Sequence, residues 1–141
     1  MRVAVIDSGG ANIGSVRYAL DRLGVESVVS GDAAVITACE RVILPGVGAA
    51  AVAMARLREL DLIDTIRRLQ QPLLGICLGM QLLFEASEEG NVETLGLMKG
   101  QVTKLPEAPG VRIPHMGWNR LAFRRQSTLL DGIEAGAQCY F

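Results

Sequence analysis

Hydrophobic residues in the first half of the chain alternate between short apolar runs and stripes with helical spacing. Four β-branched or leucine-rich runs predict buried strands at residues 2–6, 25–29, 41–44 and 73–76. Apolar positions three or four residues apart predict helices over residues 13–23, 49–60, 62–69 and 78–84. Strands that alternate with helices predict an α/β fold, with a mostly parallel sheet and helices on both faces.

Polar residues, glycine and proline mark the ends of these predicted helices. Asn12 can cap the first helix, whose last apolar position is Leu23, and Gly24 ends it. Asp61 is predicted to cap the helix over residues 62–69, which Pro72 stops.

Helical spacing fades after Gly96, and several prolines interrupt the chain. Short strands, antiparallel by expectation, are predicted at residues 101–105, 111–113 and 118–123, and a further strand begins near 138. Despite this change, no domain boundary, repeat or low-complexity segment is found, so residues 1–141 are predicted to form one domain.

Composition narrows the function classes. Half of the 141 residues are hydrophobic, which is enough for a packed core, and the net charge is −1. The 14 basic and 15 acidic residues are interspersed, which argues against nucleic-acid binding and a basic membrane patch. The longest uncharged run, residues 42–55, is too short and too interrupted to span a bilayer. The three cysteines lack metal-ligand spacing, so no metal site is predicted, and they fit a reducing cytoplasm.

Cys77 lies between two glycines, in the sequence Gly-Ile-Cys-Leu-Gly at residues 75–79. A strand-like run precedes it and a helical run follows, which is the arrangement of a nucleophile elbow. Glycines relieve crowding in such a strained turn, and a helix N-terminus favours the thiolate. The pattern predicts a cysteine nucleophile for acyl transfer. The alternative is a small hydrophobic side chain buried in the core.

A cysteine nucleophile needs amide donors for the oxyanion of its tetrahedral intermediate. Leu78, which follows the cysteine, is one candidate donor. Val47 is the other, because the glycines beside it in Pro-Gly-Val-Gly (45–48) let its peptide flip. An ordinary strand-to-helix turn is the alternative for that loop. Gln81, one helical turn after Cys77, can contact a substrate or be satisfied by backbone groups.

Two further patterns bear on nucleotide binding and on a catalytic base. Residues 9–14 follow a strand and open a helix, but Ala11 replaces one glycine of a dinucleotide fingerprint and Glu26 is early for its carboxylate. His115 is the only histidine and so the available imidazole base for a cysteine. Its Pro-His-Met-Gly-Trp-Asn segment fits a partner surface as well as a core.

Taken together, the motifs resemble the class I glutamine amidotransferases. Three separated segments carry this resemblance: residues 7–15 (Asp-Ser-Gly-Gly-Ala-Asn-Ile-Gly-Ser), 45–48 and 75–83. A fourth, residues 114–119, narrows it to the glutaminase subunits of imidazole glycerol phosphate synthases, which belong to histidine biosynthesis. The order and spacing agree along the whole chain, and the resemblance implies a flavodoxin-like sheet.

The resemblance also implies a reaction. Cys77 attacks the side-chain amide of glutamine, ammonia leaves, and water hydrolyses the glutamyl thioester. The implied oxyanion donors are Val47 and Leu78. The implied substrate-binding residues are Gly46, Gly48 and Gln81. No cofactor and no metal are implied.

A (β/α)8-barrel cyclase is the implied partner, in a heterodimer. The implied interface residues are Asn12, Met116, Gly117, Trp118 and Asn119. Ammonia passes through the barrel to a reaction that yields imidazole glycerol phosphate and AICAR. A flip of the Val47 peptide gives the partner a means to switch on the glutaminase.

Two departures from the family pattern matter. Ser8 stands where the family usually has an aromatic residue. The family's catalytic His and Glu follow a segment that begins as this chain ends, at Tyr140 and Phe141. The chain is therefore expected to be the first two-thirds of the subunit, incomplete at its C-terminus and nearly inactive. The alternatives are a non-catalytic module that docks a barrel, or another elbow-type cysteine amidotransferase or hydrolase.

Overall fold

The computed structural model describes residues 1–9 and 12–141. Two compact units are formed, Met1–Lys104 and Leu105–Phe141, and each is described by itself. Gly10 and Ala11, which belong to the dinucleotide-like pattern considered above, lie outside the described residues. The prediction that residues 1–141 form one domain stays a prediction.

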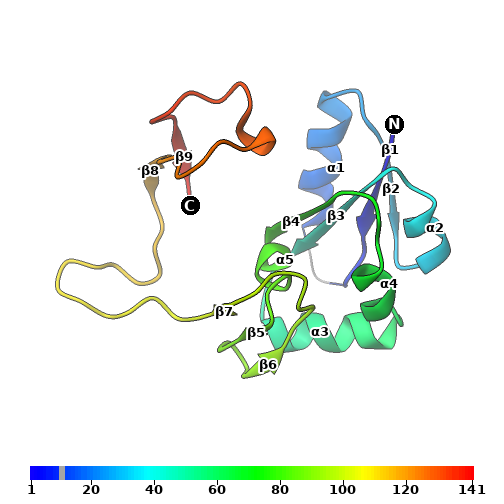
Figure 1. Ribbon diagram of the computed structural model, residues 1–141, viewed down its shortest axis with the longest axis horizontal. Helices are drawn as coiled ribbons and strands as arrows, with labels where there is room; N and C mark the ends of the chain where they lie inside the picture. Colours follow the sequence, from blue (N-terminus) through cyan, green and yellow to red (C-terminus); the bar gives the residue numbers. More distant parts are fainter. Residues whose placement is uncertain (10–11) are drawn as a thin grey trace. The chain divides into compact units, whose positions relative to one another are not determined.

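A four-stranded parallel sheet is at the centre of the first unit (Figure 1). Its strands are β1 (Arg2–Ile6), β2 (Glu26–Ser30), β3 (Arg41–Gly46) and β4 (Leu73–Cys77). The strand order is β2-β1-β3-β4, and all three neighbouring pairs are parallel. All four strands were predicted within two residues, and the predicted parallel sheet is confirmed.

Helices cover both faces of this sheet, as predicted. They are α1 (Ile13–Arg22), α2 (Ala33–Thr37), α3 (Ala50–Glu59), α4 (Ile63–Arg67) and α5 (Leu78–Gln81). Side chains alternate between faces along a strand. The face with Val3 and Val5 packs against α1, and the face with Ala4 and Ile6 packs against the other four helices. Figure 1 shows α1 and α3 on opposite sides of the sheet.

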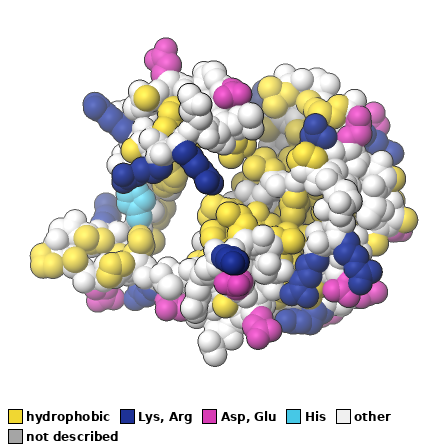
Figure 2. All heavy atoms as spheres, in the orientation of Figure 1, with side chains coloured by type: hydrophobic (Ala, Val, Ile, Leu, Met, Phe, Trp, Pro, Cys, Tyr) yellow, Lys and Arg dark blue, Asp and Glu magenta, His cyan; other side chains and the backbone are white. Residues whose placement is uncertain are grey.

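Part of β4 presents apolar side chains to the surface. Leu74 pairs with Ile43 and so lies on the α1 face of the sheet, yet it is 39% exposed. Ile76 on the same face and Met80 on α5 are exposed as well. Figure 2 shows hydrophobic side chains gathered on the surface over β4 and α5. Among the described helices, α1 covers β1 and β2 better than it covers β4.

The ends of α1 follow the sequence signals closely. The Asn12 side chain accepts a hydrogen bond from the Ser15 amide at 3.4 Å, and Gly24 has a φ of +66°. Leu23, predicted as part of the apolar stripe, is instead 75% exposed. The reason is that the helix ends at Arg22 and the chain turns toward β2, which leaves Leu23 outside the packed stripe.

Two predicted helix boundaries are wrong. Asp61 has a φ of +54° and does not cap α4, whose N-cap residue is Leu62. The left-handed turn at Asp61 brings the Leu62 amide to the Leu57 carbonyl at 2.9 Å, so α4 follows α3 directly. The helix predicted over residues 78–84 ends at Gln81, because the following amides form tighter turns that lead into the next strand.

β3 continues through Pro45 to Gly46 instead of ending at Leu44. The pairing between β1 and β3 ends at Ile43, so only β4 pairs with this part of the strand. The missing amide of Pro45 therefore breaks no bond with β1. The extension carries the strand to the position opposite Cys77.

Short strands follow the central sheet. In the first unit β5 (Ala86–Ser87) pairs antiparallel with β6 (Val92–Glu93) and parallel with β7 (Gln101–Val102). In the second unit β8 (Trp118–Arg120) and β9 (Gln138–Tyr140) form an antiparallel pair, with the 3-10 helix η1 (Thr128–Leu130) between them. The antiparallel expectation is wrong for β7, which reaches β5 through a crossover. Residues 111–113 form no strand, since no neighbouring segment pairs with them.

Within the described part of the chain, no helix combines the length and the apolar character needed to cross a membrane.

The two faces of the sheet differ enough to be tested by a pair of leucine substitutions. Leu44 is fully buried, so Leu44→Ala is expected to lower the free energy of unfolding by roughly 2–5 kcal/mol. Leu74, on the exposed part of β4, is the matched control, and Leu74→Ala is expected to cost less than about 1.5 kcal/mol. Urea unfolding of both variants measures the difference. Equal losses would contradict the burial described for the two strands.

Candidate active site

Cys77 is the last residue of β4, and α5 begins with the next residue. Its φ of +54° and ψ of −119° are strained for a residue with a side chain. The thiol is exposed, whereas the neighbouring Leu78 is 2% exposed and Cys39 is buried. An exposed thiol on a strained strand-to-helix turn fits a nucleophile elbow, and it argues against a cysteine that merely fills the core.

Three glycines let α5 lie directly against the sheet. A Cβ added at Gly79 would overlap the carbonyl oxygen of Leu44 on β3. A Cβ at Gly75 would lie 2.5 Å from the Cα of Met80, and one at Gly46 would lie 2.7 Å from the amide nitrogen of Gly79. The glycines of the Cys77 sequence therefore allow backbone to pack on backbone, in addition to forming a tight turn.

The loop after β3 lies beside the elbow. Gly46 and Cys77 are paired residues of β3 and β4, so the two strands leave the sheet side by side. The residues that follow them are Val47 and Leu78, whose amides are the two predicted oxyanion donors. Gly48 has a φ of +83°, and a Cβ there would meet nothing within 4 Å. Its backbone conformation, rather than lack of space, is what favours glycine at that position.

α5 has only four residues, which changes one part of the expected chemistry. The helix predicted over residues 78–84 was expected to favour the thiolate through its dipole, but the single turn observed has few aligned peptide groups. Any stabilisation of a thiolate at Cys77 therefore depends on individual backbone amides near the elbow.

A hollow adjoins Gln81, one helical turn after the cysteine. It is lined by Gln81, Ser87, Glu88, Glu89, Val102, Thr103 and Lys104. Glu88 and Glu89 bring carboxylates to this hollow and Lys104 brings an ammonium group, so it carries charges of both signs. Sequence reasoning missed both glutamates, because they lie in a turn with no recognisable spacing and only the fold brings them beside Gln81.

His115 lies in the second unit and has partners there. Its Nε2 atom is 3.0 Å from Nδ2 of Asn119, and its ring centroid is 6.3 Å from that of Phe141. These contacts join the histidine to the predicted partner-facing segment.

The second unit also exposes aromatic side chains. Trp118 on β8 and Tyr140 on β9 meet edge to face with centroids 5.6 Å apart, and they are 69% and 59% exposed. Met116, two residues before Trp118, is exposed as well. Gly117 exchanges backbone hydrogen bonds with Phe141. Asn12, the predicted interface residue of the first unit, is exposed there and caps α1. Exposed aromatic residues and methionine are typical of protein interfaces.

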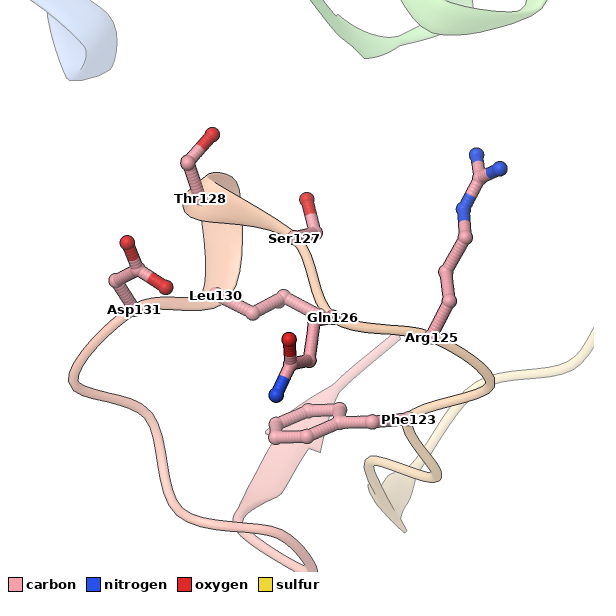
Figure 3. Close-up of a pocket in the computed structure, with 7 residues that line it drawn as sticks. All are labelled: Phe123, Arg125, Gln126, Ser127, Thr128, Leu130 and Asp131. Carbon is pink, nitrogen blue, oxygen red and sulfur yellow. The ribbon is translucent and has the colours of Figure 1, made fainter.

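The second unit contains a hollow of its own, whose polar side chains do not form a site (Figure 3). It is lined by Phe123, Arg125, Gln126, Ser127, Thr128, Leu130 and Asp131. Figure 3 shows the side chains of Arg125, Ser127 and Thr128 pointing away from the Phe123 ring. Ser127 caps η1 by accepting a hydrogen bond from the Leu129 amide at 3.3 Å. The polar groups do not converge, so this hollow is not a candidate site.

No cluster of three or more His, Cys, Asp or Glu side chains that can hold a metal ion is found among residues 1–9 and 12–141.

Comparison with known proteins places the sequence among amidotransferases. The family model for glutamine amidotransferase class-I matches residues 4–140. Over 139 residues the chain is 61% identical to the imidazole glycerol phosphate synthase subunit HisH of Xanthomonas oryzae pv. oryzae (strain MAFF 311018). It is 60% identical to the subunit of the same name from Xylella fastidiosa (strain Temecula1 / ATCC 700964). Each match covers 99% of this chain and 70% of the relative.

A solved structure supports the fold. The crystal structure of a glutamine amidotransferase matches this chain with a TM-score of 0.66 and 21% sequence identity. The match covers 84% of this chain and 64% of that chain, so this chain spans somewhat less than two-thirds of its length.

The close packing at the elbow predicts a large effect of one added methyl group. Gly79→Ala is expected to lower the free energy of unfolding by about 3 kcal/mol or more, because the new Cβ overlaps the Leu44 carbonyl. Gly14→Ala, in α1, is the control. There the nearest atom is 3.8 Å away, and alanine is expected to stabilise the helix by about 0.5–1 kcal/mol. Urea unfolding distinguishes the two, and a well-tolerated Gly79→Ala would contradict the packing.

Proposed function

The chain belongs to the class-I glutamine amidotransferase family, and on that premise we propose that it acts as the glutaminase subunit of an imidazole glycerol phosphate synthase. In this role it releases ammonia from glutamine and delivers it to a cyclase subunit. The observation that carries the proposal is the exposed, strained Cys77 paired in register with Gly46.

The proposed reaction begins when the thiolate of Cys77 attacks the side-chain carbonyl carbon of glutamine. The carbon–sulfur bond forms, and the carbonyl electron pair moves to the oxygen. Amides of Val47 and Leu78 donate hydrogen bonds to this oxyanion, and one such donor typically lowers the barrier by about 3 kcal/mol. Collapse of the intermediate breaks the carbon–nitrogen bond, and the nitrogen leaves as ammonia after gaining a proton. Water then hydrolyses the thioester to glutamate and restores the thiol.

A general base must take the thiol proton and return it to the leaving nitrogen. We assign this role to none of the described residues. His115, the only histidine, has its contacts with Asn119 and Phe141 in the second unit.

Glutamine is proposed to bind beside the thiol of Cys77. Its side chain lies at the loop after β3, and its α-amino group lies in the hollow beside α5. Gly46 and Gly48 present backbone groups, and the Gln81 amide lies one turn from the cysteine. In the hollow next to Gln81, the carboxylates of Glu88 and Glu89 complement the α-ammonium group of an amino acid.

The proposed partner is a (β/α)8-barrel cyclase, which the chain meets as a heterodimer. Proposed contacts are Asn12, Met116, Gly117, Trp118 and Asn119. Ammonia passes to the barrel and is used to form imidazole glycerol phosphate and AICAR. We propose a cytoplasmic location, which the sparse and unpaired cysteines support.

Covalent labelling tests the nucleophile without requiring turnover. The glutamine analogue 6-diazo-5-oxo-L-norleucine is expected to modify Cys77 and to leave Cys39 and Cys139 unmodified, as read by peptide mass spectrometry. Cys77→Ser is expected to abolish labelling, and Cys139→Ser, the control at a partly exposed cysteine, to leave it unchanged. Partner binding without any labelling of Cys77 would favour a non-catalytic docking module.

Ammonia release with the cyclase present tests the absence of a base among the described residues. Residues 1–141 alone are expected to release little ammonia from glutamine, because none of them is assigned as the base that the full reaction needs, and His115→Ala is expected to leave that rate unchanged. Fast release that His115→Ala abolishes would show instead that His115 is the base.

Binding to the cyclase tests the aromatic surface. Trp118→Ala is expected to weaken binding by roughly 30-fold, because a large exposed aromatic side chain at an interface centre commonly contributes about 2 kcal/mol. Leu129→Ala removes a similarly exposed side chain from η1 in the same unit and is expected to have little effect. Titration calorimetry measures both. Equal affinities for the wild type and Trp118→Ala would exclude Trp118 from the interface.

A further inference from the structure

The first turn of α3 is capped by a side chain from a distant part of the sequence. Its own N-cap residue, Ala49, has no side-chain acceptor for the free amides. Oε2 of Glu89, 39 residues further along, accepts a hydrogen bond from the Ala50 amide at 3.3 Å. Ala50 is fully buried beneath this exposed carboxylate, which satisfies its amide.

The turn that carries Glu89 is itself fixed against α3. The Glu89 amide donates to Oγ of Ser87 at 3.2 Å, and Ser87 is almost fully buried. Gly90 follows with a φ of +79°, and a Cβ added there would lie 2.9 Å from the Cβ of Ala51. The β5–β6 turn therefore contacts the first two residues of α3, with no space for a larger side chain between them.

α3 begins where the loop after β3 ends. At its start the loop is held by the pairing of Gly46 with Cys77, and at its end by the bond from Ala50 to Glu89. Between these two anchors Val47 is half exposed, and Gly48 has open space around it. The freedom of the loop is thus confined to the peptides around Val47 and Gly48.

We infer that Glu89 is a positioning residue for this oxyanion loop, anchoring its second end so that the Val47 amide is held within reach of an oxyanion beside Cys77. The inference rests on the proposed function, in which Val47 is an oxyanion donor. Glu89 also lines the hollow next to Gln81, where the proposed function places the α-ammonium group of glutamine.

Amide hydrogen exchange on the whole chain tests the anchor. Glu89→Ala is expected to accelerate exchange at Ala50 and Ala53 about tenfold, since it removes the side-chain acceptor that caps α3. Glu89→Gln keeps an acceptor oxygen, and its effect is expected to stay below about threefold. The matched control is Glu88→Ala, which removes another carboxylate from the same hollow. Glu88 accepts a hydrogen bond from the Lys104 amide and not from α3, so this variant should leave exchange in α3 unchanged.

A second measurement separates positioning from binding of an ammonium group. The probe is 5-chlorolevulinate, a chloromethyl ketone shaped like the glutamine side chain but without an α-ammonium group. Oxyanion donors activate its ketone, whereas iodoacetamide alkylates a thiol by direct displacement. Glu89→Ala is expected to lower the ratio of the two Cys77 alkylation rates about tenfold, in line with weakened oxyanion donation. Glu89→Gln is expected to restore most of this ratio.

Each outcome decides one point. Unchanged exchange at Ala50 and Ala53 in Glu89→Ala overturns the anchor. Faster exchange with an unchanged alkylation ratio overturns its effect on the oxyanion loop, and leaves Glu89 with a structural or ammonium-binding role. If no glutamine-shaped reagent labels Cys77 of the wild type, the proposed function fails instead, and the exchange data still decide whether Glu89 anchors α3.

Discussion

The close approach of α5 to the sheet is the constraint on which the candidate site depends. Backbone of α5 lies against backbone of β3 and β4, and glycine at positions 46, 75 and 79 is what allows it. This contact holds Cys77 in its strained conformation, because the helix must begin immediately after the strand. It also leaves the thiol at the rim of the sheet, since the helix occupies the space where a buried side chain would otherwise pack.

The rest of the site follows from how parallel strands end. β3 and β4 run in the same direction and finish at paired residues, so the loop after β3 and the elbow after β4 emerge together. A third segment, the turn between β5 and β6, closes on the start of α3 and supplies carboxylates to the hollow beside Gln81. The candidate site is therefore assembled from separate parts of the sequence. The elbow supplies the thiol, the loop after β3 supplies the Val47 amide, and the β5–β6 turn supplies charged side chains.

The two units divide the proposed work. Met1–Lys104 contains the proposed nucleophile, the proposed oxyanion loop and the hollow, and its core is built on both faces of one sheet. Leu105–Phe141 is built around one antiparallel strand pair whose aromatic side chains are exposed. Side chains as large as Trp118 and Tyr140 lose favourable burial when they face water, so a partner surface that covers them gains that burial on binding.

The sequence alone determined the four main strands, the first helix and the elbow at Cys77. These elements depend on local properties, namely the spacing of apolar residues and the glycines and prolines that end helices and strands. Local signals failed where a distant segment decides the outcome. Asp61 turns instead of capping, and the helix after Cys77 stops after one turn because the next residues join another sheet. The capping of α3 by Glu89 had no local signal at all. Only tertiary packing brings that carboxylate, 39 residues away in the sequence, to the amide of the buried Ala50.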